Sequence, residues 1–132
     1  MSASGRLGET ARIALGGVRI VAGTAGLVAP AMIISRFGDS KPTANAAAIY
    51  GLRLFGIRTV LIGADLIRLR GRDLDRALAV APIIHATDTA TVLALLGNKQ
   101  LSPDRARPLA LISGLNTVLA VTAYLASRRS RS

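Results

Sequence analysis

Six ionisable side chains lie inside long apolar stretches of this sequence, where charged groups are rare. They are Arg19, Arg53, Arg58, Asp65, His85 and Asp88. A charge at the centre of a membrane-spanning helix costs about 2.5–3.5 kcal/mol even on the most lenient insertion scale. Such side chains therefore face the interior of a helical bundle, and we expect these six to form a buried network or a ligand-binding site.

Depth within the stretches predicts which of these groups meet. Arg58, His85 and Asp88 fall near the middle of their stretches, and so does the polar Asn116 in the last stretch. We expect Arg58 to pair with Asp88, with His85 hydrogen-bonded nearby. Asn116 or Thr117 would complete this network, because polar side chains of neighbouring membrane helices hydrogen-bond to one another.

The remaining charges predict an imbalance in the interior. Asp65 lies nearer the end of its stretch, where it could pair with Arg68 or with Arg19. Three buried arginines would then face two carboxylates. With His85 neutral, the interior would hold an excess positive charge. We expect water, a lipid phosphate, an anionic ligand or an acidic residue of a partner protein to neutralise this charge.

Most catalytic chemistry finds little support in the residue types. The chain has no Cys and one His, which excludes thiolate zinc sites and cysteine nucleophiles and disfavours a His-rich metal site. His85 and Asp88, spaced i and i+3, could act as a general base and its orienting group. The alternative is structural: a buried Arg58–Asp88 pair can fix helix register without doing chemistry. We predict no catalytic residue, no metal and no cofactor.

Four apolar stretches position these groups, and each is long enough to cross a bilayer. They cover residues 11–34, 44–67, 77–96 and 108–126. About 20 residues of helix span a hydrocarbon core about 30 Å thick, and only helices and closed barrels satisfy their backbone hydrogen bonds in lipid. The stretches are too long and too evenly apolar for barrel strands. We therefore predict an all-α bundle of four transmembrane helices, forming a single membrane domain over residues 1–132.

The composition supports lipid as the solvent of this domain. Hydrophobic residues make up 51% of the chain and charged residues 18%, below the roughly 25% of soluble domains. A cleaved signal peptide is disfavoured because the first stretch is too long and Arg19 interrupts it. A soluble four-helix bundle would need a polar outer face on every helix, whereas residues 21–34 and 109–126 carry no charge on any face.

The net charge of +10 suggests nucleic acid as a partner, but its distribution favours a membrane. Aromatic residues are only 3% of the chain, whereas single-strand binders use aromatic side chains for base stacking. The basic residues instead gather in the short gaps between apolar stretches, as topology signals do. We expect a lipid bilayer and no nucleic acid as partner.

The same basic residues predict the orientation. In a four-span chain the two ends and the middle loop share one side, which holds nine Lys or Arg residues against five on the other. Because the side richer in Lys and Arg stays in the cytoplasm, both termini are predicted to be cytoplasmic. The basic tail, residues 127–132, would be a topology anchor or a contact for anionic lipid. The 15 Arg and two Lys are typical of a GC-rich bacterial genome, so we expect the bacterial cytoplasmic membrane.

Glycines follow the same helical periodicity as the charges. Gly16, Gly23 and Gly26 share one face of the first stretch with Arg19, and Gly56 and Gly63 form a stripe on the second. Small residues at this spacing let membrane helices approach closely. We expect these five glycines to pack helix against helix.

The string Arg53-Leu54-Phe55-Gly56-Ile57-Arg58, followed by Gly63, resembles the signature of an uncharacterised bacterial family of four-helix integral membrane proteins that is distantly DoxX-like. The intramembrane Asp88 fits the same pattern, and the resemblance covers about the central half of the chain. It implies the four-span fold and a structural or functional role for Arg53, Arg58 and Asp88. It implies no activity.

Three functions are compatible with this sequence. The first is a non-enzymatic accessory or self-associating subunit of a membrane complex, favoured by the small size, the glycine faces and the unbalanced charge. The second is a small oligomeric transporter or channel for protons or for an anionic or lipidic substrate, in which His85 and Asp88 carry protons. The third, an enzyme acting on a lipid or quinone, is the least favoured because no nucleophile or metal motif is present.

Overall fold

The computed structural model describes residues 2–130, and all regular secondary structure within that range is helical. Its elements are α1 (Ala3–Val28), α2 (Pro30–Arg36), the 3-10 turn η1 (Pro42–Ala44), α3 (Ala46–Arg68), α4 (Gly71–Gly97) and α5 (Pro103–Arg129). The helices α1, α3, α4 and α5 are each long enough and apolar enough to cross a membrane. The all-α prediction and its four apolar helices are thus confirmed.

The first predicted span, residues 11–34, is wrong as a single helix. The chain leaves the helical conformation at Ala29, whose backbone has φ −133° and ψ 50°, and Pro30 begins the short helix α2. A proline disfavours the helical conformation of the residue before it and suits the first position of a new helix. The first long helix therefore starts and ends earlier in the chain than the apolar stretch suggests.

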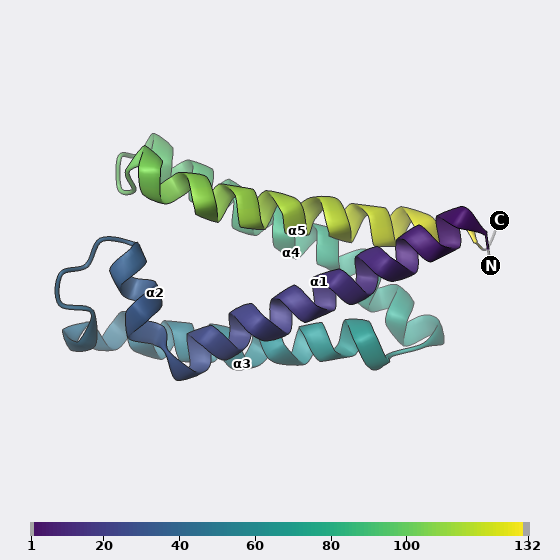
Figure 1. Ribbon diagram of the computed structural model, residues 1–132, viewed down its shortest axis with the longest axis horizontal. Helices are drawn as coiled ribbons and strands as arrows, with labels where there is room; N and C mark the ends of the chain where they lie inside the picture. The colour runs from purple at the N-terminus through teal and green to yellow at the C-terminus, as the bar shows by residue number, and fades with distance from the viewer. Residues whose placement is uncertain (1, 131–132) are drawn as a thin grey trace.

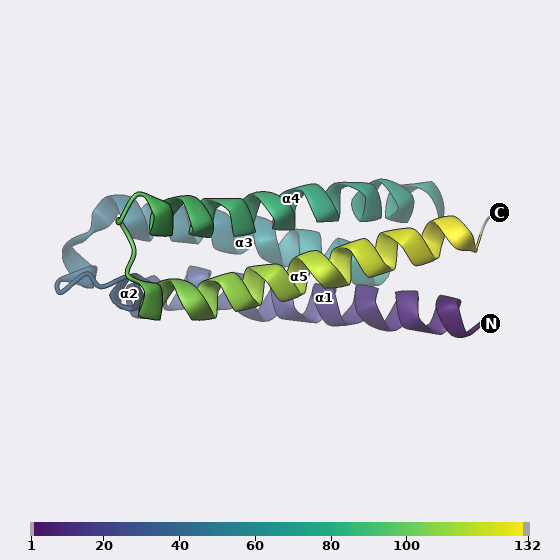
Figure 2. The same cartoon turned by 90° about the horizontal axis from the view of Figure 1, so that it is seen from above.

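The four long helices form two layers that meet at one end and diverge toward the other. One layer holds α1 and α3, and the other holds α4 and α5 (Figures 1 and 2). Helix α1 packs mainly on α3 and also contacts α5, whereas α3 and α4 have few contacts with each other. Both termini lie at the end where the layers meet, together with the short α3–α4 connection (Figure 1). We call this the closed end, and the opposite one the open end.

A small apolar core fills the closed end. Leu15 of α1, Leu66 of α3 and Leu78 of α4 are almost fully buried, and Ala120 and Ala123 of α5 complete the same cluster. The alanines of α5 let the other helices approach one another. The layers are therefore held together in the half of the bundle that carries the chain ends.

Glycines hold the first layer together by a close backbone approach between α1 and α3. A methyl group added at Gly23 would lie 2.6 Å from the carbonyl oxygen of Gly56, and one at Gly63 would lie 2.7 Å from the carbonyl oxygen of Gly16. A methyl group added at Gly26 would lie 3.1 Å from the carbonyl oxygen of Leu52. No side chain fits at Gly23 or Gly63 unless the facing backbone moves, so the glycine stripes set the spacing of the two helices.

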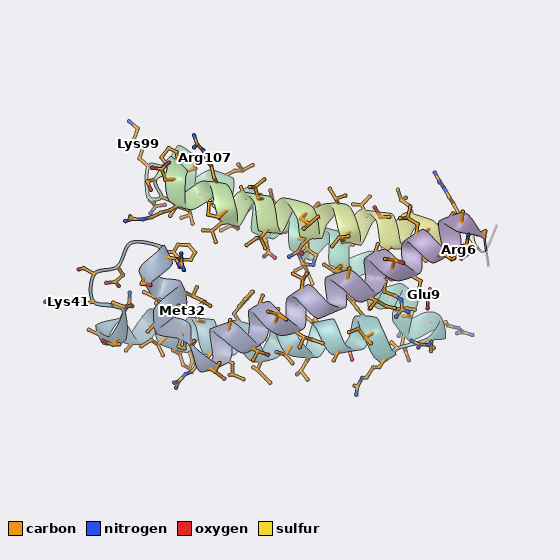
Figure 3. The ribbon with its side chains drawn as sticks, viewed as in Figure 1. Arg6, Glu9, Met32, Lys41, Lys99 and Arg107 are labelled. Atoms are coloured by element: carbon orange, nitrogen blue, oxygen red, sulfur yellow. The ribbon has the colours of Figure 1, made fainter. Side chains whose placement is uncertain are left out.

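Charged side chains mark the two ends of the bundle. Arg6 and Glu9 lie at the closed end, and Lys41, Lys99 and Arg107 lie around the loops of the open end (Figure 3). This distribution matches four helices that cross a bilayer with both termini on one side. Of the predicted basic tail, residues 131 and 132 lie outside the described residues.

Candidate functional site

A polar contact joins the two layers near the middle of the bundle. The Nη1 atom of Arg19 in α1 lies 2.6 Å from Nε2 and 3.4 Å from Nδ1 of His85 in α4, and both side chains are buried. A guanidinium can only donate, so Nε2 of His85 accepts. The imidazole of a neutral histidine then has its proton on Nδ1.

Asp88 lies beside the other nitrogen of the same ring. Its Oδ2 is 3.6 Å from Nδ1 of His85, one helical turn earlier in α4, and its side chain is about half exposed, at 45%. Asp88 also supplies an attractive electrostatic interaction to the guanidinium of Arg19. The chain from Arg19 through His85 to Asp88 therefore holds one positive and one negative charge, so its net charge is zero.

The sequence of α1 explains why Arg19 points inward. Arg12, Gly16, Arg19 and Gly23 are spaced i, i+4, i+7 and i+11, which places them on one face of the helix. All four are buried against the neighbouring helices. Because Gly16 and Gly23 bring α1 close to α3, Arg19 between them has no access to lipid and extends toward α4.

Asn116 in α5 is a buried polar residue whose side-chain oxygen has no partner in the described part of the chain. Its side chain is only 9% exposed, and its Oδ1 atom has no hydrogen-bond partner among residues 2–130. The Nε atom of Arg19 is buried without a partner in the same range. Buried polar groups in folded proteins almost always have a partner. These two atoms therefore point to something that the chain itself does not supply.

Both side chains line a cavity of about 260 Å³ between the two layers. The buried part of its wall is polar: Arg19, Thr59, His85, Ser113 and Asn116. The exposed part carries large apolar side chains: Phe37, Phe55 and Ile112. The polar wall is therefore the inner one, and the rim carries mostly apolar groups together with Thr91 and the half-exposed Asp88.

The cavity ends within the bundle. On the side of the closed end, the leucine and alanine core of Leu15, Leu66, Leu78, Ala120 and Ala123 fills the space between the helices. A continuous aqueous path through one copy of the chain would have to cross this core. The geometry resembles a binding pocket more than a pore.

The predicted Arg58–Asp88 pair is wrong in this structure. Arg53 and Arg58 are both exposed on α3, and Asp88 lies beside His85 instead. The reason is that α3 turns Gly56, Thr59 and Gly63 toward its neighbours. This orientation leaves both arginines off the contact face. Two of the three arginines expected in the interior therefore lie on the outside of α3.

Asp65 takes the first of its two predicted partners. Its Oδ1 atom lies 3.4 Å from Nη2 of Arg68, one turn later in the same helix, and both side chains are substantially exposed. Asp65 therefore belongs to the closed end of α3 and not to the buried cluster. Exposed pairs of this kind contribute little to stability, about 0–1 kcal/mol.

Sequence reasoning missed one buried charge, Arg12. Its guanidinium donates hydrogen bonds to the carbonyl oxygens of Leu66 and Ile67, at the last turn of α3. Those carbonyls have no helical partner of their own, so Arg12 caps α3 from α1. The signal was present in the spacing, because Arg12 stands one turn before Gly16 on the face that carries Arg19.

The chemistry open to this cluster is limited by its hydrogen bonds. The acceptor nitrogen of His85 is occupied by Arg19, so no free ring nitrogen is left to take a proton from a substrate. This geometry argues against His85 as a general base or as a freely exchanging proton carrier. Within residues 2–130, no group of three His, Cys, Asp or Glu side chains is arranged to hold a metal ion.

No protein-family model, curated protein or solved structure matches this chain. The resemblance of the stretch 53–58 to a four-helix membrane family stays a prediction. The site must therefore be interpreted from its own contacts.

Proposed function

We propose that this protein is a non-enzymatic subunit of a membrane assembly and that it binds its partner through the outer face of α3. The observation that supports the proposal is the exposure of Arg58 in the middle of a helix that is apolar enough to cross a membrane. A charge turned toward hydrocarbon is unfavourable. A partner that covers it with a carboxylate would remove this penalty.

The depth of Arg58 makes the case stronger for it than for Arg53. Arg58 is about 18 Å from the start of α3 and about 15 Å from its end, at 1.5 Å per residue. Arg53 lies only about 10 Å from the start of the helix, so its long side chain can extend toward the membrane surface. Arg58 is therefore the group that most requires a partner within the membrane.

The surroundings of Arg58 suit a helix–helix contact. The outer face of α3 also presents the exposed apolar side chains of Tyr50, Ile57 and Leu61. Arg53 and Arg58 flank this face on opposite sides. A partner helix with an apolar stripe and a buried Asp or Glu at the depth of Arg58 would complement both features.

A different protein suits this face better than a second copy. The apolar stretches 44–67 and 77–96 hold two carboxylates, of which Asp88 lies beside His85 and Asp65 beside Arg68. In a dimer with its axis along the membrane normal, Asp65 would lie about 10 Å in depth from Arg58. Self-association by this pair is therefore unfavourable, although the experiment below detects it.

The experiment is purification of the full chain from its native membrane in a mild detergent, followed by native mass spectrometry. We expect a complex with another membrane protein that is lost in Arg58→Leu. Arg107→Leu is the matched control, because Arg107 is exposed at the end of the bundle. A wild-type protein that is a lone monomer would contradict the proposal, as would a complex that Arg58→Leu leaves intact.

We further propose that both termini lie in the cytoplasm of a bacterium. The support is the bias of Lys and Arg toward the ends and the middle loop. Because the chain has no cysteine, single cysteines report topology directly. In spheroplasts, a membrane-impermeant maleimide should label Ser40→Cys at once and Ser4→Cys only after permeabilisation. The reverse pattern would invert the orientation.

A small transporter for an anionic or lipidic substrate or for protons is the second candidate. The cavity lined by Arg19, His85 and Asn116 favours it, while the packed core beyond the cavity disfavours an open channel. Transport would require the two layers to move against each other. Flux into proteoliposomes that disappears in Asp88→Ala would support this candidate, and flux equal to that of empty vesicles would remove it.

A further inference from the structure

We propose that the cavity beside Arg19 and His85 binds an uncharged amphiphile that enters from the bilayer with its head group first. The head group carries both a hydrogen-bond donor and an acceptor. This inference is independent of the partner-binding face on α3, because Arg58 and its neighbours Ile57 and Leu61 do not line the cavity.

The hydrogen-bonding requirement comes from Asn116. Its Oδ1 atom has no hydrogen-bond partner among residues 2–130, although the residue is nine-tenths buried. A carboxamide offers an acceptor oxygen and two donor hydrogens, and a half-turn of the side chain exchanges the two. A buried polar group left without a partner is unfavourable. A ligand with a donor and an acceptor on neighbouring atoms satisfies Asn116 in either orientation.

The absence of net charge in the cluster selects an uncharged head group. The positive charge of Arg19 is balanced by the negative charge of Asp88, which lies on the other side of the His85 ring. An anion would add an unmatched negative charge beside Asp88, and a cation would lie beside Arg19. A neutral head group changes neither balance, so it is the one that this interior accepts at least cost.

The distribution of the lining residues selects an amphiphile. The buried wall is polar, with Thr59, Ser113 and Asn116 among its residues, while Phe55 and Ile112 at the rim are exposed and apolar. A molecule dissolved in the bilayer can place its head against the inner wall and leave its chain between the rim residues. The volume of about 260 Å³ is several times the roughly 30 Å³ of one water, enough for a small head group.

The test measures binding of lipids with one common acyl chain to the full-length protein in nanodiscs. The probes are monooleoylglycerol, which is neutral with donors and acceptors, oleate at pH 8, which is an anion, and methyl oleate, which has acceptors only. We expect saturable binding of monooleoylglycerol at least tenfold tighter than that of the other two. Tighter binding of oleate would overturn the uncharged head group, and no saturable binding of any probe would overturn the site.

Two variants with matched controls locate the binding. Asn116→Leu removes the unpartnered amide and should weaken monooleoylglycerol binding about tenfold without lowering the melting temperature, whereas Asn98→Leu in the exposed loop should not weaken it. Ile112→Trp fills the rim and should abolish binding, while Ile83→Trp on the exposed side of α4 should not. Unchanged binding in Asn116→Leu and Ile112→Trp would place the lipid elsewhere and overturn the proposal.

Discussion

The two faces of α3 differ in burial: the face with the glycines is packed against α1, and the face with the arginines is exposed. The inner face carries Gly56 and Gly63, which touch the backbone of α1. The outer face is flanked by Arg53 and Arg58, which are exposed. A soluble protein would place charges outward for hydration, but lipid offers no such gain. The contact of the glycines with α1 therefore determines which face of α3 is buried, and this leaves Arg53 and Arg58 exposed.

Arg19 in the neighbouring helix α1 is buried, in contrast to the exposed Arg58 of α3. Arg19 lies on the same face of α1 as Gly16 and Gly23, so the contact that excludes Arg58 from the interior draws Arg19 into it. His85 and Asp88 then serve Arg19 and not Arg58. Arg19 is buried because it shares the glycine face of its helix, whereas Arg58 lies off the glycine face of α3 and is exposed.

The largest effect is expected from breaking the inner face. Gly56→Leu would force its Cβ into the backbone of α1 near Leu27, at 2.7 Å from the amide nitrogen. Overpacking of this kind costs about 3 kcal/mol, and the melting temperature in nanodiscs should fall steeply. Gly51→Leu is the matched control on the same helix, since nothing lies within 4 Å of a Cβ there. Equal melting temperatures for the two variants would refute the close α1–α3 contact.

The next effect concerns the partner of Arg19. Arg19→Leu leaves His85 without its hydrogen-bond donor and Asp88 without the positive charge that attracts it, and because Asp88 is half exposed we expect a loss of about 2 kcal/mol. The double variant Arg19→Leu/Asp88→Leu should recover part of this loss, since it removes both charges. A double-mutant cycle on melting temperatures measures the coupling. Purely additive losses would mean that the two charges do not interact.

The sequence predicted the elements of this fold well and their pairing poorly. Four apolar helices follow from length and composition, because lipid allows few alternatives. Arg19 contacts His85 and not Asp65, its predicted alternative partner, and the apolar stretch 11–34 hides the break at Ala29 that places α1 further toward the N-terminus. This shift brings Arg19 to the level of His85, a pairing that the spacing of the apolar residues did not suggest.

The choice of face on α3 could not be made from that helix alone. Its sequence contains two adjacent polar or small stripes, one with Arg58 and one with Arg53, Gly56 and Gly63. Periodicity assigns residues to stripes, but it does not say which stripe meets a neighbour. The answer depends on the complementary glycines of α1, because a close backbone approach requires a small residue from both helices.

A much smaller effect is expected on the outer face. Arg58 is exposed in the isolated chain, and it would also face lipid when the inserted helices are separated. Arg58→Leu should therefore change the free energy of unfolding of the isolated protein by less than about 0.5 kcal/mol. Its melting temperature in nanodiscs should stay close to that of the wild type. A clear destabilisation, similar to that of Arg19→Leu, would show that Arg58 is buried after all and would erase the contrast between the two arginines.

The smallest effect lies outside both faces, in the loop of the open end before α3. Asp39 accepts a hydrogen bond from the Asn45 side chain at 2.9 Å and another from the backbone N–H of Lys41 at 2.8 Å. These bonds lower the pKa of Asp39 below its ordinary value, the Asn45 bond having the larger effect. Because the folded pKa is depressed, the stabilising contribution is present above the unfolded pKa of about 3.9 and is lost as the pH falls through the folded pKa.

Titration of the Asp39 carboxyl carbon by NMR should give a pKa below about 3.9, and Asn45→Ala should raise this pKa. Ser40→Ala is the control in the same loop. An Asp39 pKa that Asn45→Ala leaves unchanged would mean that the loop is not held by this bond, and α3 would then begin without the Asp39 contact to its capping residue.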